Sequence, residues 1–259
     1  MPDFYRIADF LGYLLRARGK HGVHSPFVYQ FVTQILESNS VHPSFHHIEL
    51  TRAKMLSSRA EIIMTDLGAG KKKRTRALRE ITANTAKQAK YGRLLHRVIN
   101  TFQPEFAVEL GSCTGISTMY QAAAMSRNLL YSIEGDATLA SIARANLEAV
   151  GLSAHAQVIQ GSFEQVLPTL LREMPRLDYL FADGNHSLEA TLHYFELALS
   201  RAHEGSIFIF DDIHWSDEMK RAWYIIQRHK EVRVSMDIFA MGLIFFRKEQ
   251  EKEHFILRY

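Results

Sequence analysis

The chain has 259 residues, of which 47% are hydrophobic, and a formal net charge of +3. This length can bury a sizeable core, and so small a charge does not by itself indicate a nucleic-acid partner. A single cysteine excludes a disulfide framework and fits a reducing compartment, so we expect a cytoplasmic protein. No apolar stretch reaches the length of a membrane span, and residues 1–20 carry too many interspersed charges for a signal peptide, so no membrane association is expected.

The first ninety residues, 1–90, are predicted to form an N-terminal helical extension. Phe4 to Ala17 and Phe27 to Leu36 have amphipathic helical patterns, and a basic loop, residues 19–26, lies between them. Such an extension could form a lid over the ends of a sheet, or it could simply cover a sheet edge. Both interpretations remain open at this point.

Three histidines follow these helices. His42, His46 and His47 lie on both sides of Pro43, and their spacing matches no common zinc pattern. We therefore expect this group to be a surface loop.

A first glycine motif lies within the extension. Residues 62–70 read as a strand followed by Asp66-Leu67-Gly68-Ala69-Gly70. The position 25 residues after Asp66 is Tyr91, in a helical stretch without a strand-ending acid. We interpret Asp66 to Gly70 as a turn. The basic run that follows, Lys71 to Arg76, reads as a solvated face, with the alternative that it grips an anionic substrate or a phosphate.

A second glycine motif has a more informative context. Phe106 to Leu110 is a short apolar run of the buried-strand type, Gly111 and Gly115 bracket a tight turn, and Ile116 to Ser126 has the composition of a helix. The pattern predicts a strand, a glycine-rich turn and a helix.

Two acids accompany this motif at neighbouring strand ends. Glu109 precedes the turn, and Glu134, which lies 25 residues later, ends the next predicted strand, Leu129 to Ile133. A dinucleotide fold needs G-x-G-x-x-G, whereas only G-x-x-x-G is present. Glu109 would repel a pyrophosphate but suits a ligand with an ammonium and a sulfonium, such as S-adenosylmethionine. Glu134 would then accept both ribose hydroxyls. The alternative is a generic α/β turn with two incidental acids.

The alternation of strands and helices continues to the C-terminus and predicts a mainly parallel sheet with helices on both faces. Strands are predicted at Ala156 to Gln160, Leu177 to Phe181 and Ser206 to Phe210, and helices at Ala137 to Val150, after Ser162 to about Met174, at Leu188 to Ala202 and at Ser216 to Lys230.

The last two predicted strands differ from the others. Only four residues separate Val232 to Ile238 from Leu243 to Phe246, too few for a helical crossover, so these strands must form an antiparallel hairpin. We predict an α/β fold with a Rossmann-like, doubly wound, mainly parallel seven-stranded sheet and a C-terminal antiparallel hairpin. Residues 91–259 are assigned to this domain.

From about Tyr91 to Arg247 the chain resembles class I S-adenosylmethionine-dependent O-methyltransferases of the catechol and caffeoyl-coenzyme A type, and their sugar-modifying relatives. The resemblance implies that Glu134 binds the ribose and that residues 161–163 border the adenine. The cofactor-binding residues it implies are Glu109, Gly111, Ser112, Thr114, Gly115, Ser117, Glu134, Gly161, Ser162, Phe163 and Asp183.

Acids at two later strand ends suggest a metal. Asp183 follows one apolar strand, and Asp211 and Asp212 follow another, so three carboxylates could converge at one rim. Oxygen ligands of this kind suit Mg²⁺ or another hard divalent cation better than zinc. In the resembling enzymes two aspartates and an Asn or Asp hold the metal at matching positions. The alternative role of these acids is helix capping or hydrogen bonding to the cofactor.

His186 and Asp183 are the predicted catalytic residues. His186 lies three residues after Asp183, where the catechol-type enzymes carry a lysine, and an imidazole can act as a general base near neutrality. The alternative is a hydrogen-bonding surface histidine. His214 and Trp215 could line an acceptor pocket, and Trp215 is equally compatible with the core.

We therefore expect a metal-assisted O-methyltransferase that uses S-adenosylmethionine and acts on a small hydroxylated acceptor. Its expected partners are that acceptor and a second copy in a homodimer. Two alternatives are a metal-independent methyltransferase of another acceptor class and a non-catalytic scaffold that binds the nucleoside.

Overall fold

The computed structural model describes residues 2–66 and 72–259 and divides the chain into two compact units. One unit is continuous, residues 39–173, and is called the central unit below. The other combines residues 1–38 with 174–259 and is called the split unit. The predicted boundary after residue 90 does not coincide with either division and stays a prediction.

The sheet of the central unit consists of three parallel strands in the order β3-β4-β5. Its strands are β3 (Ala107–Leu110), β4 (Leu130–Glu134) and β5 (Ala156–Gln160). Every residue of β3 is buried, as expected for a strand covered on both faces. Val108 lies opposite Tyr131, and Ile133 lies opposite Ile159, so the carboxyl ends of the three strands lie at one edge.

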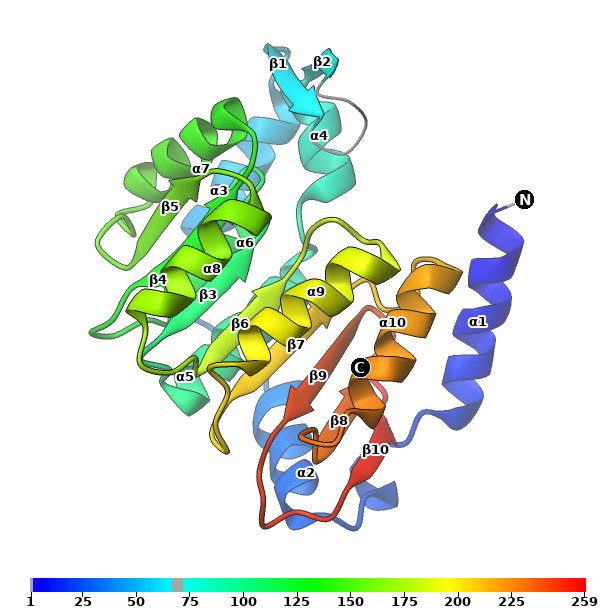
Figure 1. The fold of residues 1–259 in the computed structure, drawn as a ribbon. Helices are drawn as coiled ribbons and strands as arrows, with labels where there is room; N and C mark the ends of the chain where they lie inside the picture. The colour runs from blue at the N-terminus through cyan, green and yellow to red at the C-terminus, as the bar shows by residue number, and fades with distance from the viewer. Residues whose placement is uncertain (1, 67–71) are drawn as a thin grey trace. The chain divides into compact units, whose positions relative to one another are not determined.

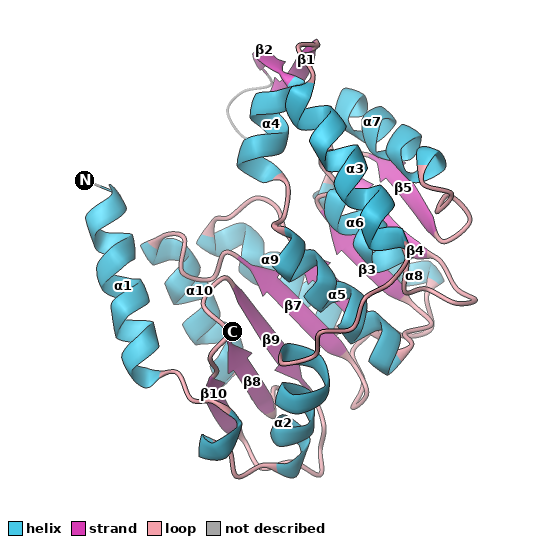
Figure 2. Cartoon of the chain, turned by 180° about the vertical axis from the view of Figure 1, so that it is seen from behind, coloured by secondary structure: helices cyan, strands magenta, loops and turns pink. Residues whose placement is uncertain are grey.

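Helices cover both faces of these strands. They are α5 (Ala89–Phe102), α6 (Ile116–Ala122), α7 (Ala137–Ala149) and α8 (Phe163–Glu173). Helix α8 lies in front of the strands in Figure 1, and α5 and α6 lie in front in the reverse view of Figure 2. The start of α7 is fixed by Asp136, whose carboxylate accepts the backbone N–H groups of Thr138 and Leu139 at 2.9 Å each.

The N-terminal part of the central unit is not entirely helical. Helix α3 (Ser44–Ser57) is followed by an antiparallel hairpin of β1 (Glu61–Asp66) and β2 (Lys72–Ala77), and then by α4 (Leu78–Thr85). The predicted helices of the extension are thus accompanied by one antiparallel hairpin that the sequence did not indicate. Most of the predicted turn, residues 67–70, lies outside the described residues, as does Lys71. Arg74 and Arg76 of the basic run are exposed, in agreement with a solvated face.

The predicted surface loop of histidines is corrected. His46 and His47 are exposed residues of the first turn of α3, and only His42 precedes the helix. The His42 ring lies 4.8 Å from the ring of His96 on α5, a contact that the sequence spacing did not indicate.

The strands of the split unit have the order β10-β8-β9-β7-β6. They are β6 (Tyr179–Ala182), β7 (Ile207–Asp211), β8 (Val234–Asp237), β9 (Met241–Phe245) and β10 (Glu253–Ile256). β6 and β7 are parallel, and β9 is antiparallel to both β7 and β8, which confirms the predicted hairpin. Strands β3 to β10 number eight among the described residues, and β1 and β2 form a separate hairpin. The count is one more than the seven strands predicted, because β10 pairs in parallel with β8.

The helices of the split unit are α1 (Pro2–Arg16), α2 (Pro26–Phe31), α9 (Leu188–Leu199) and α10 (Asp217–Arg228), with a short 3₁₀ turn at Lys20–Gly22 and a π-helical continuation of α2 at Val32–Leu36. Helices α9 and α10 lie on one face of the strands, and α2 lies on the opposite face (Figures 1 and 2). Phe27 and Phe31 pack their rings edge-on against Phe245 of β9. Within residues 2–66 and 72–259, no helix combines the length and the apolarity needed to cross a bilayer.

Candidate cofactor and catalytic sites

The turn between β3 and α6 has a backbone conformation that depends on glycine. Gly111 and Gly115 have φ angles of 99° and 84°, a region in which a Cβ atom is strained. A Cβ at Gly115 would also approach the backbone of Ala143 in α7 to 3.1 Å. The predicted strand, glycine turn and helix are therefore present, and substitution of Gly115 would force α6 and α7 apart.

Glu134, at the end of β4, is bonded to this turn. Its Oε2 atom accepts the backbone N–H of Cys113 at 2.7 Å, and its Oε1 atom accepts that of Asp136 at 2.9 Å. Burial raises the pKa of the Glu134 carboxyl, against the opposing effect of these backbone donors. Glu134 is thus held beside the 111–115 turn, at the end of the strand next to β3, as its spacing from Glu109 predicted.

Glu109 is placed differently from what its charge suggested. Its side chain is 0% exposed, and its oxygens accept hydrogen bonds from Thr118 (2.6 Å), Gln121 (2.6 Å) and Ser132 (2.5 Å). The carboxylate is therefore directed into the interior, where hydrogen bonds from three side chains stabilise its negative charge. Direct contact between Glu109 and a ligand ammonium stays a prediction, and the observed geometry gives this acid a role in joining β3, β4 and α6.

The hydroxyl side chains of the predicted cofactor motif are also buried. Ser112, Thr114 and Ser117 are each less than a tenth exposed. The Ser112 hydroxyl pairs with that of Ser132, and the Thr114 carbonyl accepts the Asn146 amide at 2.8 Å. In this structure these groups stabilise the turn from inside, and their contact with a cofactor remains predicted.

The third cofactor segment, Gly161 to Phe163, follows β5. The Gly161 N–H donates to the Glu134 carbonyl at 2.9 Å, so this segment begins beside the acid that is predicted to bind the ribose. Ser162 and Phe163 are half-buried, and Phe163 opens α8. Glu134 and the segment from Gly161 to Phe163 therefore lie next to each other at the ends of β4 and β5.

The predicted catalytic residues lie together in the split unit. His186 Nε2 is 3.6 Å from Asp183 Oδ1 and 3.8 Å from Asp212 Oδ2, and all three side chains are partly exposed. Asp183 follows β6 and Asp212 follows β7, and parallel pairing of these strands places both carboxylates at one end. We call Asp183, His186 and Asp212 the acid rim. Its two distances are too long for hydrogen bonds.

The third predicted metal ligand is separate from this rim. Asp211 is the last residue of β7 and only 1% exposed, whereas Asp212 has a positive φ of 54° and a half-exposed side chain. Consecutive residues at the end of a strand point to opposite sides, so the two acids have different environments. Among the described residues no group of three His, Cys, Asp or Glu side chains is arranged to hold a metal ion. The metal site stays a prediction.

The structure also contains a second His–Asp pair, His214 and Asp237, which the sequence did not predict. His214 Nε2 lies 2.7 Å from Asp237 Oδ2, and the His214 ring stacks on Phe239 at 4.9 Å with an interplanar angle of 9°. The sequence indicates His214 as a possible pocket residue but gives no signal for Asp237, because the β7–β9–β8 order brings the two together. Trp215 is 52% exposed, which excludes the alternative that it belongs to the core.

Residues 108–213 match the family described as Methyltransferase domain. A catechol O-methyltransferase of Niastella koreensis is 28% identical over 124 residues, which are 47% of this chain and 55% of that protein. A catechol O-methyltransferase of Mycobacterium tuberculosis is 26% identical over 129 residues, or 49% and 57% of the two chains. The chain thus spans little more than half the length of these relatives.

Solved structures show the same fold at low identity. An O-methyltransferase of Bacillus cereus in complex with SAH superposes with a TM-score of 0.58 at 17% identity, covering 85% of this chain and 97% of that one. A SAH-bound methyltransferase of Podospora anserina gives a TM-score of 0.61 at 13% identity, with 86% and 97% covered. The predicted resemblance to class I S-adenosylmethionine-dependent O-methyltransferases and the predicted Rossmann-like fold are confirmed.

Proposed function

We propose that this protein is an S-adenosylmethionine-dependent O-methyltransferase that acts on a small hydroxylated acceptor. One observation carries the proposal: the Glu134 carboxylate is bonded to the Cys113 amide of the glycine turn at 2.7 Å. An acid fixed at this place can accept ribose hydroxyls beside a turn that a nucleoside can approach. The names of the two catechol O-methyltransferase relatives support a hydroxyl as the acceptor group.

Apart from Asp183, which lies in the split unit and whose contact with the cofactor stays a prediction, the residues that would hold the cofactor belong to the central unit. Glu134 would accept the two ribose hydroxyls, the 111–115 turn would lie against the amino-acid portion, and residues 161–163 would border the adenine. When bound, the cofactor supplies a methyl group on a positively charged sulfur. Glu109 accepts hydrogen bonds from Thr118 and Ser132 and so stabilises α6 and β4 from the protein interior.

His186 is the proposed general base. The imidazole would take the proton of the acceptor hydroxyl, and the bound cofactor would supply the methyl group that this oxygen accepts. Asp183 and Asp212, each within 4 Å of His186 Nε2, would stabilise the imidazolium that results. Asp183 therefore acts as the partner of the base.

A divalent cation at Asp183, Asp211 and Asp212 remains part of the proposal, supported by the hard oxygen character of these ligands. The described geometry does not fit it well, because Asp211 is buried while Asp183 and Asp212 lie beside His186. The steps above are therefore derived from the protein side chains alone. A homodimer and a cytoplasmic location likewise stay predictions.

The cofactor assignment is tested by calorimetric titration with S-adenosylhomocysteine. Glu134→Ala would leave ribose hydroxyls without a charged acceptor, so affinity should fall by roughly 10- to 100-fold. Asp66→Ala is the matched control, since Asp66 precedes the other glycine motif, and it should bind as the wild type does. Unchanged binding by Glu134→Ala, or a loss only in Asp66→Ala, would reject this site.

The acceptor is tested with a panel of small phenols, catechols and sugars, by following transfer of an isotopically labelled methyl group. Activity that survives a chelator would reject the metal while leaving the methyltransferase assignment intact. Binding of S-adenosylhomocysteine without methylation of any compound would favour the non-catalytic scaffold.

A further inference from the structure

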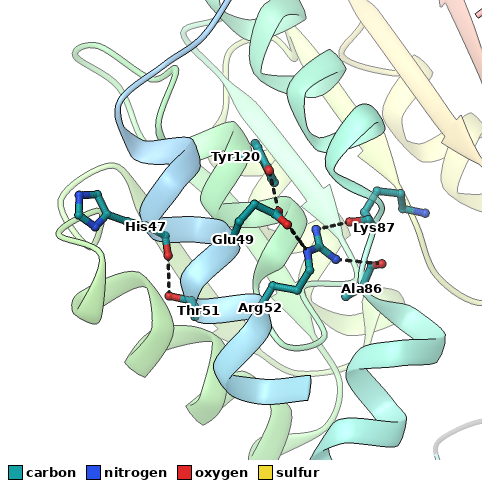
Figure 3. Close-up of polar contacts among 7 residues, drawn as sticks. All are labelled: His47, Glu49, Thr51, Arg52, Ala86, Lys87 and Tyr120. Atoms are coloured by element: carbon teal, nitrogen blue, oxygen red, sulfur yellow. Dashed lines mark hydrogen bonds and ion pairs between the residues drawn. The ribbon is translucent and has the colours of Figure 1, made fainter. Parts of the chain in front are cut away.

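Helix α3 is joined to the cofactor helix α6 by a side-chain network in the central unit (Figure 3). Tyr120 of α6 donates its hydroxyl to Glu49 Oε1 at 2.8 Å. Arg52, one turn further along α3, donates its Nε–H to both Glu49 oxygens at 3.0 Å. The Glu49 carboxylate therefore links α6 to Arg52, and α6 begins at Ile116, directly after Gly115 of the turn.

The same arginine reaches the chain segment between α4 and α5. Its guanidinium donates to the Ala86 carbonyl at 3.4 Å and to the Lys87 carbonyl at 2.5 Å. The residue before them, Thr85, places its hydroxyl 3.0 Å from the sulfur of Cys113 in the glycine turn. A continuous path of contacts thus runs from the turn through Thr85 and Arg52 to Glu49, and returns through Tyr120 and α6.

A third contact from α3 reaches the turn by another route. The Asn146 amide of α7 donates both to the Thr114 carbonyl, at 2.8 Å, and to the sulfur of Met55, at 3.2 Å. Residues of α3 are therefore connected to Cys113 and to Thr114, two adjacent positions of the turn, through different intermediates.

The network is buried where it meets α6. The Tyr120 side chain is 0% exposed, and its ring occupies the space that a Cβ at Gly92 would need, at 2.3 Å. Burial, followed by the hydrogen bond to Glu49, holds the pKa of Tyr120 well above its usual range, so the hydroxyl donates at every ordinary pH. Arg52 has only 13% of its side chain exposed, so solvent screens its bonds weakly.

We propose that Glu49 and Arg52 are positioning residues, which hold the glycine turn in its cofactor-binding conformation without touching the cofactor. The inference rests on the proposed function, since it requires the 111–115 turn to be the cofactor site. Helix α3 is then neither a lid nor a simple cover of a sheet edge. It is a brace between the cofactor helix and the segment that contacts Cys113.

The physical consequence is a change in population. If the brace is broken, the turn occupies its binding conformation for only part of the time, and the apparent dissociation constant rises by the inverse of that fraction. A residue that only stabilises the fold would lower the melting temperature but leave the affinity of the folded protein unchanged.

Two brace variants and one control separate these cases. Arg52→Lys keeps the charge beside Glu49 but loses the planar fork that reaches both Ala86 and Lys87. Tyr120→Phe removes one hydroxyl and keeps the buried ring. Thr51→Ala is the matched control, because Thr51 lies next to Arg52 on α3 and its hydroxyl donates to the His47 carbonyl of the same helix (Figure 3).

Affinity for S-adenosylhomocysteine is measured by calorimetry, and hydrogen exchange is followed at the Cys113 and Gly115 amides, well below the melting temperature. We expect affinity to fall about tenfold in Arg52→Lys, which loses bonds from the guanidinium to two carbonyls, and about fivefold in Tyr120→Phe, which loses a single hydroxyl bond. Exchange at both amides should accelerate in the apo variants and return to the wild-type rate at saturation. Thr51→Ala should match the wild type in every measurement.

Lower melting temperatures with affinity and exchange at wild-type values would overturn the brace. Glu134→Ala, measured in the same series, separates this failure from that of the proposed function. If Glu134→Ala loses affinity and the brace variants do not, only the brace is wrong. If Glu134→Ala also binds normally, the cofactor site itself is wrong. Should Arg52→Lys not fold, Tyr120→Phe alone decides the outcome by the same criteria.

Discussion

Around the glycine turn of the central unit, the polar side chains are buried and bonded to one another at 2.5 to 2.9 Å, as Glu109 and Glu134 show. At the acid rim of the split unit, His186 is partly exposed and lies 3.6 and 3.8 Å from its two carboxylates. In the first region short hydrogen bonds hold the acids in place, whereas the two distances from His186 to the carboxylates of the rim are longer than a hydrogen bond.

This difference suggests two ways of building a site. A turn that presents backbone to a nucleoside must hold strained φ angles, and an internal network supplies the rigidity. Catalytic hydrogen bonds, in contrast, are often long without substrate and shorten when it binds. Mutations should therefore affect stability at the turn and turnover at the rim.

The largest effect is expected at the rim. His186→Ala should lower turnover by roughly 10²–10⁴-fold, because the acceptor proton loses its base, while affinity for S-adenosylhomocysteine stays unchanged. Steady-state rates on an identified acceptor and calorimetry on the same variant check this. A loss below threefold would remove His186 from the mechanism and break the contrast between the two regions.

A large loss of stability is expected at Glu109. Glu109→Ala would leave the buried groups of Thr118, Gln121 and Ser132 without their charged acceptor, and the free energy of unfolding should fall by about 3 kcal/mol. Urea denaturation of this variant, beside Asp212→Ala as the rim control, measures the difference. Equal stability of the two variants would contradict the contrast.

Acid should weaken the central unit through His96 of α5. This side chain is 6% exposed with no hydrogen-bond partner for either ring nitrogen among the described residues, and burial lowers its pKa to about 4, with smaller effects of His42 and Arg97. Because the folded pKa lies below the unfolded value of 6.5, its contribution is complete above pH 6.5 and is lost as pH falls toward 4. The maximum loss is about 3 kcal/mol.

Urea denaturation between pH 7 and pH 4 measures this loss, with His96→Phe as the test and His46→Ala, on the exposed face of α3, as the control. The pH slope should decrease in His96→Phe and persist in His46→Ala. If the free energy of unfolding has the same pH dependence in all three proteins, protonation of His96 does not contribute to the loss of stability in acid.

The smallest effect is expected for the rim acids. Asp183→Asn and Asp212→Asn remove one of two nearby carboxylates, so the apo protein should keep its stability or gain up to about 1 kcal/mol. Mg²⁺ titration of the same variants tests the proposed metal. A clear loss of stability in either variant would make the rim a structural element like the turn.

Several elements could be predicted closely because their signals are local. β5 occupies Ala156–Gln160 as predicted, and the hairpin of β8 and β9 follows from a connection too short for a helix. In contrast, β10 was missed, since its sequence, Glu-His-Phe-Ile, is half polar and its pairing with β8 is not visible in the chain order. The hairpin inside the extension likewise depends on pairing rather than on apolar runs.

The sequence by itself determined the glycine turn, the strand-end acids and the order of the motifs, because glycine content, short apolar runs and spacing are properties of neighbouring residues. The tertiary structure decided which way each acid points. Glu109 is directed inward to Thr118 and Gln121, and His214 meets Asp237, because side chains distant in sequence surround them. The link between α3 and α6 was decided in the same way, since Tyr120 and Glu49 lie 71 residues apart in the chain.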